Sequence, residues 1–503
     1  MNQTRNFVAV DLGASNGRAL IGRFNGSQLA LEEIHRFPNG PVPLPRLGMA
    51  AAGAGLASLH WDVLALFSEV KQGLAKAVKC CGSELASAGL DTWGVDFGLL
   101  DRQGGLVGNP YHYRDSRTDG MVEEAFRRVP REEIFANTGI QFLQLNTLIQ
   151  LFAMVEQRSP LLDIAGRLLM MPDLLNYFLT GQRVSEYTEA STSQCMDMRT
   201  GEWATGLLAR LGIPTHIFPP VVQPGTVLGP LLPHVAEETG ARQIVVVAPG
   251  THDTGSAVAA VPAENDDYAY LSSGTWSLIG VESRQAVINA KTLAFNFTNE
   301  GGVCNTIRLL KNITGLWLIQ ECRRVWQQEG TQLSWNDITA MAAAAPAFTA
   351  VLDVDAKDFL TPGDIPARIR DYCARTGQPV PGDRGTIARV VFESLALRYR
   401  HVQEMMDDLV GRRIGTLHIV GGGSQNRMVN QFAADCIGRP VVAGPVEATA
   451  IGNLLMQMLA VGAISSLEEG RQIVRNSFST ERFEPDDRGP WDEAYERFKR
   501  LIA

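Results

Sequence analysis

The sequence predicts an α/β protein made of two similar halves, and three observations support this prediction. The chain has 503 residues, more than the roughly 250 to 300 at which a single hydrophobic core stops growing, so two large domains are expected. Strand-like and helix-like segments alternate along its later part, as in a sheet covered by helices. A strand, a glycine turn and a second strand near the N-terminus are echoed near the middle of the chain. We therefore expect domains at residues 1–260 and 261–503, with a cleft between them.

The first half should open with three strands and then a helix. Apolar runs separated by turn residues predict strands at Phe7–Val10, Ala19–Phe24 and Gln28–Ile34. Apolar residues then recur at three- and four-residue spacing from about Asp62 until Gly82, which predicts a helix. Between these segments, Pro41–Leu59 has three prolines among its first five residues and then an Ala/Gly-rich stretch, typical of a surface loop. One further strand is expected around Leu90–Leu100.

The second half repeats the strand, turn and strand pattern at Asp267–Ser283 and continues with a long amphipathic helix at Thr386–Leu409. A strand, a glycine-rich loop, a helix, a strand and a helix follow. The four regular segments of this run are Thr416–Val420, Met428–Cys436, Val441–Ala443 and Ala448–Leu459.

Composition excludes several classes of partner. The net charge is −9 and the sequence has no long basic run, which argues against nucleic-acid and anionic-membrane partners. The seven cysteines are scattered without a C-x-x-C pair, so neither a zinc site nor a disulfide framework is expected. The N-terminus resembles no signal peptide and no long apolar run occurs, so we expect a cytoplasmic protein. The oligomeric state is left open.

Two glycine-containing turns are candidate phosphate sites. In the segment Asp11–Arg18, glycines let backbone N–H groups approach an anion, while Asp11, at the end of a buried strand, could hold a hydrated Mg²⁺. The segment Ser272–Thr275 is a similar turn with hydroxyl groups and no charge. An ordinary hairpin turn is the alternative interpretation of each.

A third glycine-rich segment and an acidic residue complete the candidates. Gly421–Asn426, between a strand and a helix, permits close approach of a nucleotide. Asp253 follows the strand Ile244–Ala248 and a Pro-Gly turn, and functional groups gather at such strand ends. The alternative is that Asp253 is the N-cap of a helix beginning near Gly255.

Two kinase signatures are set aside. Asp96–Gly98 spells the magnesium tripeptide of protein kinases, but no VAIK-like strand or HRD loop precedes it. The sequence also contains no G-x-x-x-x-G-K-[ST] loop, so P-loop phosphate binding is excluded.

Taken in order, the motifs DLGASNGR, THDT, SSGT and GGGSQN resemble those of the FGGY carbohydrate kinases. The resemblance spans about residues 7 to 455 and implies two ribonuclease-H-like, actin-like ATPase domains around an ATP and sugar cleft. Segments such as DTWGVDF, YRDSRTDG, EYTEASTSQ and LLKNITGLWLIQ are most similar to the members that act on L-rhamnulose. Pro41–Leu59 looks longer than the corresponding hairpin of the family.

The resemblance also implies roles for individual residues. ATP would meet Ala14, Ser15, Asn16, Gly17 and Arg18 from the first domain, and Thr275, Gln320 and Gly422 from the second. The sugar would contact Gly94, His252, Asp253, Thr254 and Asn312, with Asp253 as the general base.

The reaction that the resemblance implies is ATP plus L-rhamnulose giving ADP plus L-rhamnulose 1-phosphate, with Mg²⁺ as cofactor and the sugar as small-molecule partner. Trp93 and Phe97, which flank Gly94, are expected to form an apolar wall near the methyl group of the sugar; the alternative is that both aromatics are simply core residues. Three alternatives stay open: a kinase of this family for fuculose, xylulose or glycerol, an actin-like ATPase that is not a kinase, and a catalytically silent sugar-binding regulator.

Overall fold

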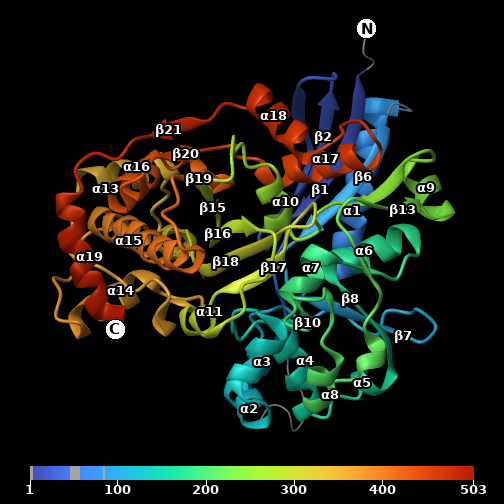
Figure 1. The fold of residues 1–503 in the computed structure, drawn as a ribbon, viewed down its shortest axis with the longest axis horizontal. Coiled ribbons are helices and arrows are strands. Elements are labelled where there is room, and N and C mark those ends of the chain that lie inside the picture. The colour runs from blue at the N-terminus through green and yellow to red at the C-terminus, as the bar shows by residue number, and fades with distance from the viewer. Residues whose placement is uncertain (1–3, 46–56, 83–84, 503) are drawn as a thin grey trace. The chain divides into compact units, whose positions relative to one another are not determined.

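A computed structural model describes residues 4–45, 57–82 and 85–502, and Figure 1 shows its helices and strands. The chain divides into two compact units, each assembled from several stretches of sequence. Unit 1 consists of residues 1–262, 282–309 and 448–477, and unit 2 consists of residues 263–281, 310–447 and 478–503. The predicted α/β class is confirmed, whereas the expected domain boundary near residue 260 stays a prediction.

Unit 1 is built on a six-stranded sheet with the strand order β13-β14-β6-β1-β2-β3. These strands span Thr226–Pro230 (β13), Val245–Ala248 (β14), Leu85–Thr92 (β6), Arg5–Leu12 (β1), Asn16–Phe24 (β2) and Leu29–Pro38 (β3). Strand β1 pairs antiparallel with β2 but parallel with β6, and β6 is also parallel to β14. The carboxyl ends of β1, β6 and β14 therefore meet at one edge of the sheet, where ligands of open α/β sheets bind.

Helices cover both faces of this sheet. Ile21 of β2 belongs to the hydrophobic core that includes Leu66 of α1, whereas the neighbouring Gly22 faces Leu454 of α17. Because successive strand residues point to opposite faces, α1 and α17 lie on opposite sides. The helices of these layers are α1 (Val63–Cys81), α6 (Met171–Thr180), α9 (Pro233–Thr239), α10 (Asp253–Ala259), α17 (Ala448–Ala460) and α18 (Leu467–Ser477). The prediction for α1 is confirmed, since Asp62 caps its first turn and Gly82 ends it.

A second hydrophobic core in unit 1 gathers short helices around a small two-stranded sheet. Its elements are β7 (Phe97–Asp101), α2 (Met121–Arg128), α3 (Arg131–Thr138), α4 (Thr147–Glu156), α5 (Leu161–Ile164), β8 (Ala165–Met170) and α8 (Thr205–Arg210). Next to it lie β9 (Ser185–Glu186), α7 (Tyr187–Thr192), β10 (Met196–Asp197), β11 (Glu202–Trp203) and β12 (Val221–Val222). Helix α11 (Ala290–Phe295) and strand β17 (Thr298–Gly301) also belong to unit 1.

Two sequence predictions in unit 1 are wrong in part. The expected surface loop at Pro41–Leu59 contains two paired strands, β4 (Val42–Pro45) and β5 (Ala57–His60), while residues 46–56 lie outside the described residues. The single strand expected at Leu90–Leu100 is two strands, β6 and β7. The break falls at Val95, whose φ of 70° cannot continue a strand.

Unit 2 carries a sheet in which β18, β16, β15, β19, β20 and β21 are neighbours in that order. The strands span Ile307–Thr314 (β18), Trp276–Ser283 (β16), Tyr268–Ser273 (β15), Thr416–Val420 (β19), Val441–Ala443 (β20) and Glu481–Phe483 (β21), and the first residues of β18 and the last of β16 count with unit 1. Its helices are α12 (Trp317–Gln328), α13 (Trp335–Ala344), α14 (Ile365–Arg375), α15 (Arg384–Val410), α16 (Arg427–Ile437) and α19 (Gly489–Ile502). Strand β15 pairs antiparallel with β16 and parallel with β19, as β1 does with β2 and β6.

Candidate functional site

Three carboxylates meet at the sheet edge of unit 1. Asp11 and Asp91 are register partners near the ends of β1 and β6. Asp253 begins helix α10, just after His252, which bridges to Thr92 in parallel register. Burial raises the pKa of Asp91, and the negative charges of Asp11 and Asp253 raise it further. This edge therefore concentrates negative charge that a cation or a protonated group could balance.

The turn after β1 is closed by backbone bonds and an ion pair. Gly13 N donates to Asn16 O at 2.9 Å, and Asn39 Nδ2 donates to Gly13 O at 2.8 Å. Arg18 binds Asp11 Oδ2 through two guanidinium nitrogens, at 2.8 and 3.2 Å. Ser15 and Asn16 are exposed at the tip. The expected ATP-binding residues Ala14 to Arg18 thus belong to one hairpin, which is exposed at Ser15 and Asn16 and buried at Gly17.

Gly17 has a packing role that the sequence did not reveal. A Cβ atom at Gly17 would lie 2.4 Å from the ring of Phe37 and 2.8 Å from Leu12. A side chain there would displace the buried Phe37, so the Gly17→Val substitution would disturb the hairpin itself. Loss of ATP use in such a variant could not be assigned to the phosphate contacts.

Asp253 is the first residue of α10 and not its N-cap, which is His252. The N-cap alternative is therefore wrong. Its Oδ1 accepts hydrogen bonds from Thr254 N and Oγ1, while Oδ2 accepts none among the described residues. About a third of the Asp253 side chain, 30%, is exposed to solvent. Burial of the rest, and then the negative charge of Asp11, raise the pKa of Asp253 to about 7. Such a carboxyl group is poised for general-base chemistry near neutral pH.

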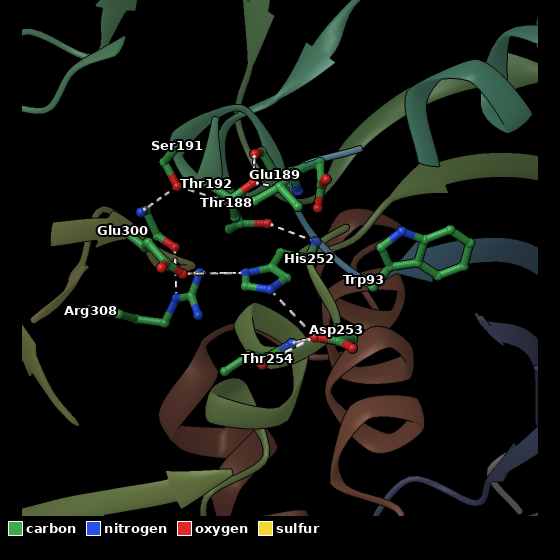
Figure 2. Close-up of polar contacts among 12 residues, drawn as sticks. Trp93, Thr188, Glu189, Ser191, Thr192, His252, Asp253, Thr254, Glu300 and Arg308 are labelled. Carbon is green, nitrogen blue, oxygen red and sulfur yellow. Dashed lines mark hydrogen bonds and ion pairs between the residues drawn. The ribbon is translucent and has the colours of Figure 1, made fainter. Parts of the chain in front are cut away.

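His252 is held as a neutral imidazole in one tautomer. Arg308 donates to His252 Nδ1 at 3.0 Å, so we assign the ring proton to Nε2, which lies 3.5 Å from Asp253 Oδ1. Burial and the positive charge of Arg308 both lower the pKa of His252 well below its usual value. Arg308 is itself fixed by Gly301 O at 2.8 Å and by the carboxylate of Glu300 at 3.2 Å. Figure 2 shows this chain of contacts from Glu300 through Arg308 and His252 to Asp253.

The segment around Gly94 is pinned to helix α7. Val95, in the left-handed region that a β-branched residue rarely adopts, donates its N–H to Thr192 Oγ1 at 3.0 Å. Its carbonyl accepts from Thr147 Oγ1 at 2.6 Å. A Cβ atom at Gly94 would lie 3.1 Å from Thr192, which is a tight contact. Gly94 is thereby placed against α7.

Asp96–Gly98, which spells the magnesium tripeptide of protein kinases, has a structural role here. This agrees with the sequence-based conclusion that it is not a kinase magnesium motif. Asp96 Oδ2 accepts from the indoles of Trp61 and Trp93, at 2.6 and 3.1 Å, and burial raises the pKa of Asp96 to about 6. Phe97 packs in the second hydrophobic core of unit 1, with Leu148 and Phe152. The apolar wall expected from Trp93 and Phe97 stays a prediction.

The expected nucleotide residues of unit 2 are uncharged and come from three segments: Thr275 from the turn between β15 and β16, Gln320 from helix α12, and Gly422 from the segment after β19. Thr275 Oγ1 donates to Gln320 Oε1 at 3.2 Å, and Thr275 O accepts from the backbone of Trp317 at 3.2 Å. Gly422 is exposed, and a Cβ atom there would meet nothing within 4 Å. Asn312 lies on β18 of the same unit. The structure therefore brings together His252, Asp253 and Thr254 in unit 1 and, separately, Thr275 and Gln320 in unit 2.

A magnesium ion fits the chemistry of the carboxylate edge. In the described part of the chain, no group of three or more acidic, histidine or cysteine side chains has the arrangement of a metal cage. Mg²⁺ usually needs only one or two carboxylates beside waters and substrate phosphates. Asp91 leaves its buried Oδ1 without a hydrogen-bond partner, while its Oδ2 accepts from Asn453 at 2.6 Å.

Sequence analysis missed Asp91, Glu186, Glu189, Glu300 and Arg308. Their carboxyl and guanidinium groups come to the site from four segments, and no short motif marks them. Two quoted runs contain some of them: DTWGVDF begins with Asp91, and EYTEASTSQ holds two glutamates in a small polar segment, which is unusual for a buried helix. Elsewhere, no helix in residues 4–45, 57–82 and 85–502 is both long enough and apolar enough to cross a membrane.

Comparisons with known proteins match this chain along most of its length. Residues 7–260 match the N-terminal domain and residues 269–461 the C-terminal domain of the FGGY family of carbohydrate kinases. A rhamnulokinase of Bacteroides thetaiotaomicron is 46% identical over 498 residues, covering 99% of each chain. A rhamnulokinase of Pectobacterium carotovorum is 43% identical and covers 99% of this chain and 96% of its own.

Solved structures share the fold at low sequence identity. A gluconate kinase of Lactobacillus acidophilus has a TM-score of 0.80 at 15% identity, covering 99% of this chain and 98% of its own. A xylulose kinase of Rhodospirillum rubrum has a TM-score of 0.78 at 21% identity, with the same coverage. These likenesses confirm the predicted actin-like ATPase fold of two domains.

Proposed function

We propose that this chain, which belongs to the FGGY family of carbohydrate kinases, transfers the γ-phosphoryl group of ATP to O1 of L-rhamnulose. The observation that carries the proposal is the near full-length similarity, at 39 to 46% identity, to rhamnulokinases of several bacteria. At this identity the fold and the phosphate turns would be expected even in a kinase for another sugar. The acceptor is therefore the part that needs a direct test.

In the proposed reaction Asp253 accepts the proton of the sugar hydroxyl as the new O–P bond forms. Its Oδ2 has no hydrogen-bond partner among the described residues, while Oδ1 is held by Thr254. The hydrogen bonds from Thr254, and then the positive charge of Arg308, favour the ionised form of Asp253. Because the pKa of Asp253 is raised to about 7, its carboxylate is a stronger base than an ordinary carboxylate, which favours proton transfer from the sugar hydroxyl.

The two turns would supply the phosphate and nucleotide contacts. Backbone N–H groups of Ala14 to Gly17 and the side chain of Arg18 suit the anionic end of ATP, and the open Gly422 suits close approach by the nucleotide. A bound Mg²⁺ would be held by Asp11 through water and would neutralise the negative charge of the phosphates. Phosphoryl transfer depends mainly on such positioning and charge neutralisation.

The test is ADP release with a panel of acceptors: L-rhamnulose, L-fuculose, D-xylulose and glycerol. The proposal predicts that kcat/KM is highest for L-rhamnulose. A higher value for any of the other three would reassign the substrate within the family. An ADP release rate that none of the four accelerates would contradict the kinase function itself and favour an ATPase that is not a sugar kinase.

A further inference from the structure

Helix α7 (Tyr187–Thr192) uses its hydroxyl groups to hold the candidate site together. Thr188 Oγ1 accepts from His252 N at 3.1 Å, Ser191 Oγ accepts from Gly301 N at 2.7 Å, and Thr192 Oγ1 accepts from Val95 N at 3.0 Å. Three separate segments of unit 1 are thus tied to one short helix. Figure 2 shows the labelled Thr188, Ser191 and Thr192 near Glu189.

Two glutamates of this segment, both completely buried, differ sharply in their bonding. Glu186 accepts hydrogen bonds from the backbone and hydroxyl groups of Thr188 and Thr251, at 2.5 to 3.0 Å. Neither carboxyl oxygen of Glu189 has any hydrogen-bond partner among the described residues. Glu186 therefore has a structural role that explains its burial, and Glu189 has none.

The place of Glu189 in the fold links it to the acceptor side of the site. Its neighbour Thr188 holds the backbone of His252, and Thr192, one turn away, holds the Gly94–Val95 segment. Glu189 is close enough to Asp253 for that charge to raise the pKa of its carboxyl group, after the larger effects of burial and of Asp173. Burial and these charges favour the protonated form of the carboxyl group, which can donate one hydrogen bond and accept others.

Leaving a buried carboxyl group without partners destabilises a protein, and such a residue persists when another requirement retains it. A sugar hydroxyl is a suitable partner, because it both donates and accepts. The protonated acid would exchange one hydrogen bond in each direction with it. Neither the ATP phosphates nor a cation would be recognised by a neutral acid in this way.

We propose that Glu189 is a specificity-determining residue of the acceptor site, whose carboxyl group exchanges hydrogen bonds with a ketose hydroxyl other than the one that is phosphorylated. The inference rests on the proposed sugar kinase function and adds to it a named contact. The partner is a hydroxyl other than O1, which belongs to Asp253, and O3 and O4 are the two that the experiment tests.

The experiment combines two variants with two substrate analogues. Glu189→Met keeps the length of the side chain but cannot form hydrogen bonds, whereas Glu189→Gln keeps a donor and an acceptor and mimics the protonated acid. Each is assayed with L-rhamnulose and with its 3-deoxy and 4-deoxy analogues. Glu186→Gln is the structural control, because it disturbs a glutamate whose bonds are all internal.

We expect Glu189→Met to lower kcat/KM for L-rhamnulose about 10- to 100-fold, with the KM for ATP unchanged, and Glu189→Gln to recover most of that loss. The wild type should disfavour one of the two deoxy analogues by a similar factor, and Glu189→Met should no longer discriminate against that analogue. The thermal midpoint of Glu189→Met should stay level or rise, because an unpartnered carboxyl group is removed, while that of Glu186→Gln should fall.

The outcomes separate the inference from the function on which it rests. A wild type that is active on L-rhamnulose, beside a Glu189→Met variant with unchanged kcat/KM or unchanged discrimination between the analogues, overturns the inference alone. If Glu189→Met does not fold, Glu189→Leu, which also lacks hydrogen-bonding groups, decides in its place: lost discrimination between the analogues supports the inference and wild-type-like discrimination contradicts it. A wild type that no ketose activates contradicts the proposed function instead.

Discussion

The hairpin β1–β2 of unit 1 and the hairpin β15–β16 of unit 2 are built alike but carry different chemistry. In each, the first strand is antiparallel to the second and parallel to a strand much later in the sequence. The first turn carries the ion pair of Asp11 and Arg18, at 2.8 Å. The second carries the neutral pair of Thr275 and Gln320, at 3.2 Å.

This difference predicts that the two hairpins have different roles although their backbones are similar. A hairpin turn offers backbone N–H groups whatever its side chains are, so either turn can approach a phosphate or a nucleotide. The edge of the first sheet adds Asp91 and Asp253 to Asp11. Burial raises the pKa of Asp91 and of Asp253, and the negative charge of Asp11 raises both further. The account therefore assigns proton transfer and the metal to unit 1, and uncharged nucleotide contacts to unit 2.

The largest effect is expected at Asp253. Asp253→Asn keeps the shape of the side chain but removes the proton acceptor, so kcat should fall by about 10² to 10⁴ while the KM for ATP changes little. Asp62→Asn is a matched control, because Asp62 does cap a helix and Asn caps equally well. Steady-state kinetics and thermal midpoints of both variants check this. A folded Asp253→Asn enzyme with near-normal kcat would contradict the assignment of proton transfer to unit 1.

A smaller effect is expected at Asp11. Asp11→Asn should raise the Mg²⁺ concentration needed for half-maximal activity about 10- to 100-fold, the usual range for residues that orient a metal from its outer shell. Excess Mg²⁺ should then restore much of the activity. Titration of activity with Mg²⁺ measures this concentration. A curve identical to that of the wild type would contradict the assignment of the metal to the first hairpin.

The smallest effect is expected in the second hairpin. Thr275→Val removes one neutral hydrogen bond and should raise the KM for ATP about 2- to 10-fold, with no change in the Mg²⁺ requirement. Ser277→Ala, in the same hairpin, loses a buried bond to Tyr399 and serves as the control that affects stability rather than ATP. A Thr275→Val defect as large as that of Asp11→Asn would contradict the contrast between the hairpins.

Much of the fold was predictable from local patterns. Helix α1 was marked at both ends, by Asp62 and Gly82. The strand predicted at Thr416–Val420 agrees with β19 in both bounds. The break after β6 was hidden, because Val95 is held in its unusual conformation by Thr147, Gln150 and Thr192, which lie far away in the sequence.

The site was predictable only where its residues adjoin one another in the sequence. The turn at Asp11–Arg18 and the segment His252–Thr254 are continuous, so motifs in the sequence pointed to them, and their roles stay predictions. Arg308 and Glu189 act across the fold, one on the tautomer of His252 and the other as a buried acid without a partner. Their roles depend on burial and orientation, which no spacing along the chain encodes.

The pH dependence of kcat/KM tests the central claim, that the Asp253 carboxylate accepts the proton, most directly. Because kcat/KM reports the free enzyme and burial raises the pKa of Asp253 to about 7, the base is protonated and inactive at lower pH. The account predicts that kcat/KM for the sugar falls about tenfold for each pH unit below about 7 and is constant above it, and that Asp253→Asn loses this dependence. An Asp253→Asn variant that keeps the wild-type profile would contradict the claim.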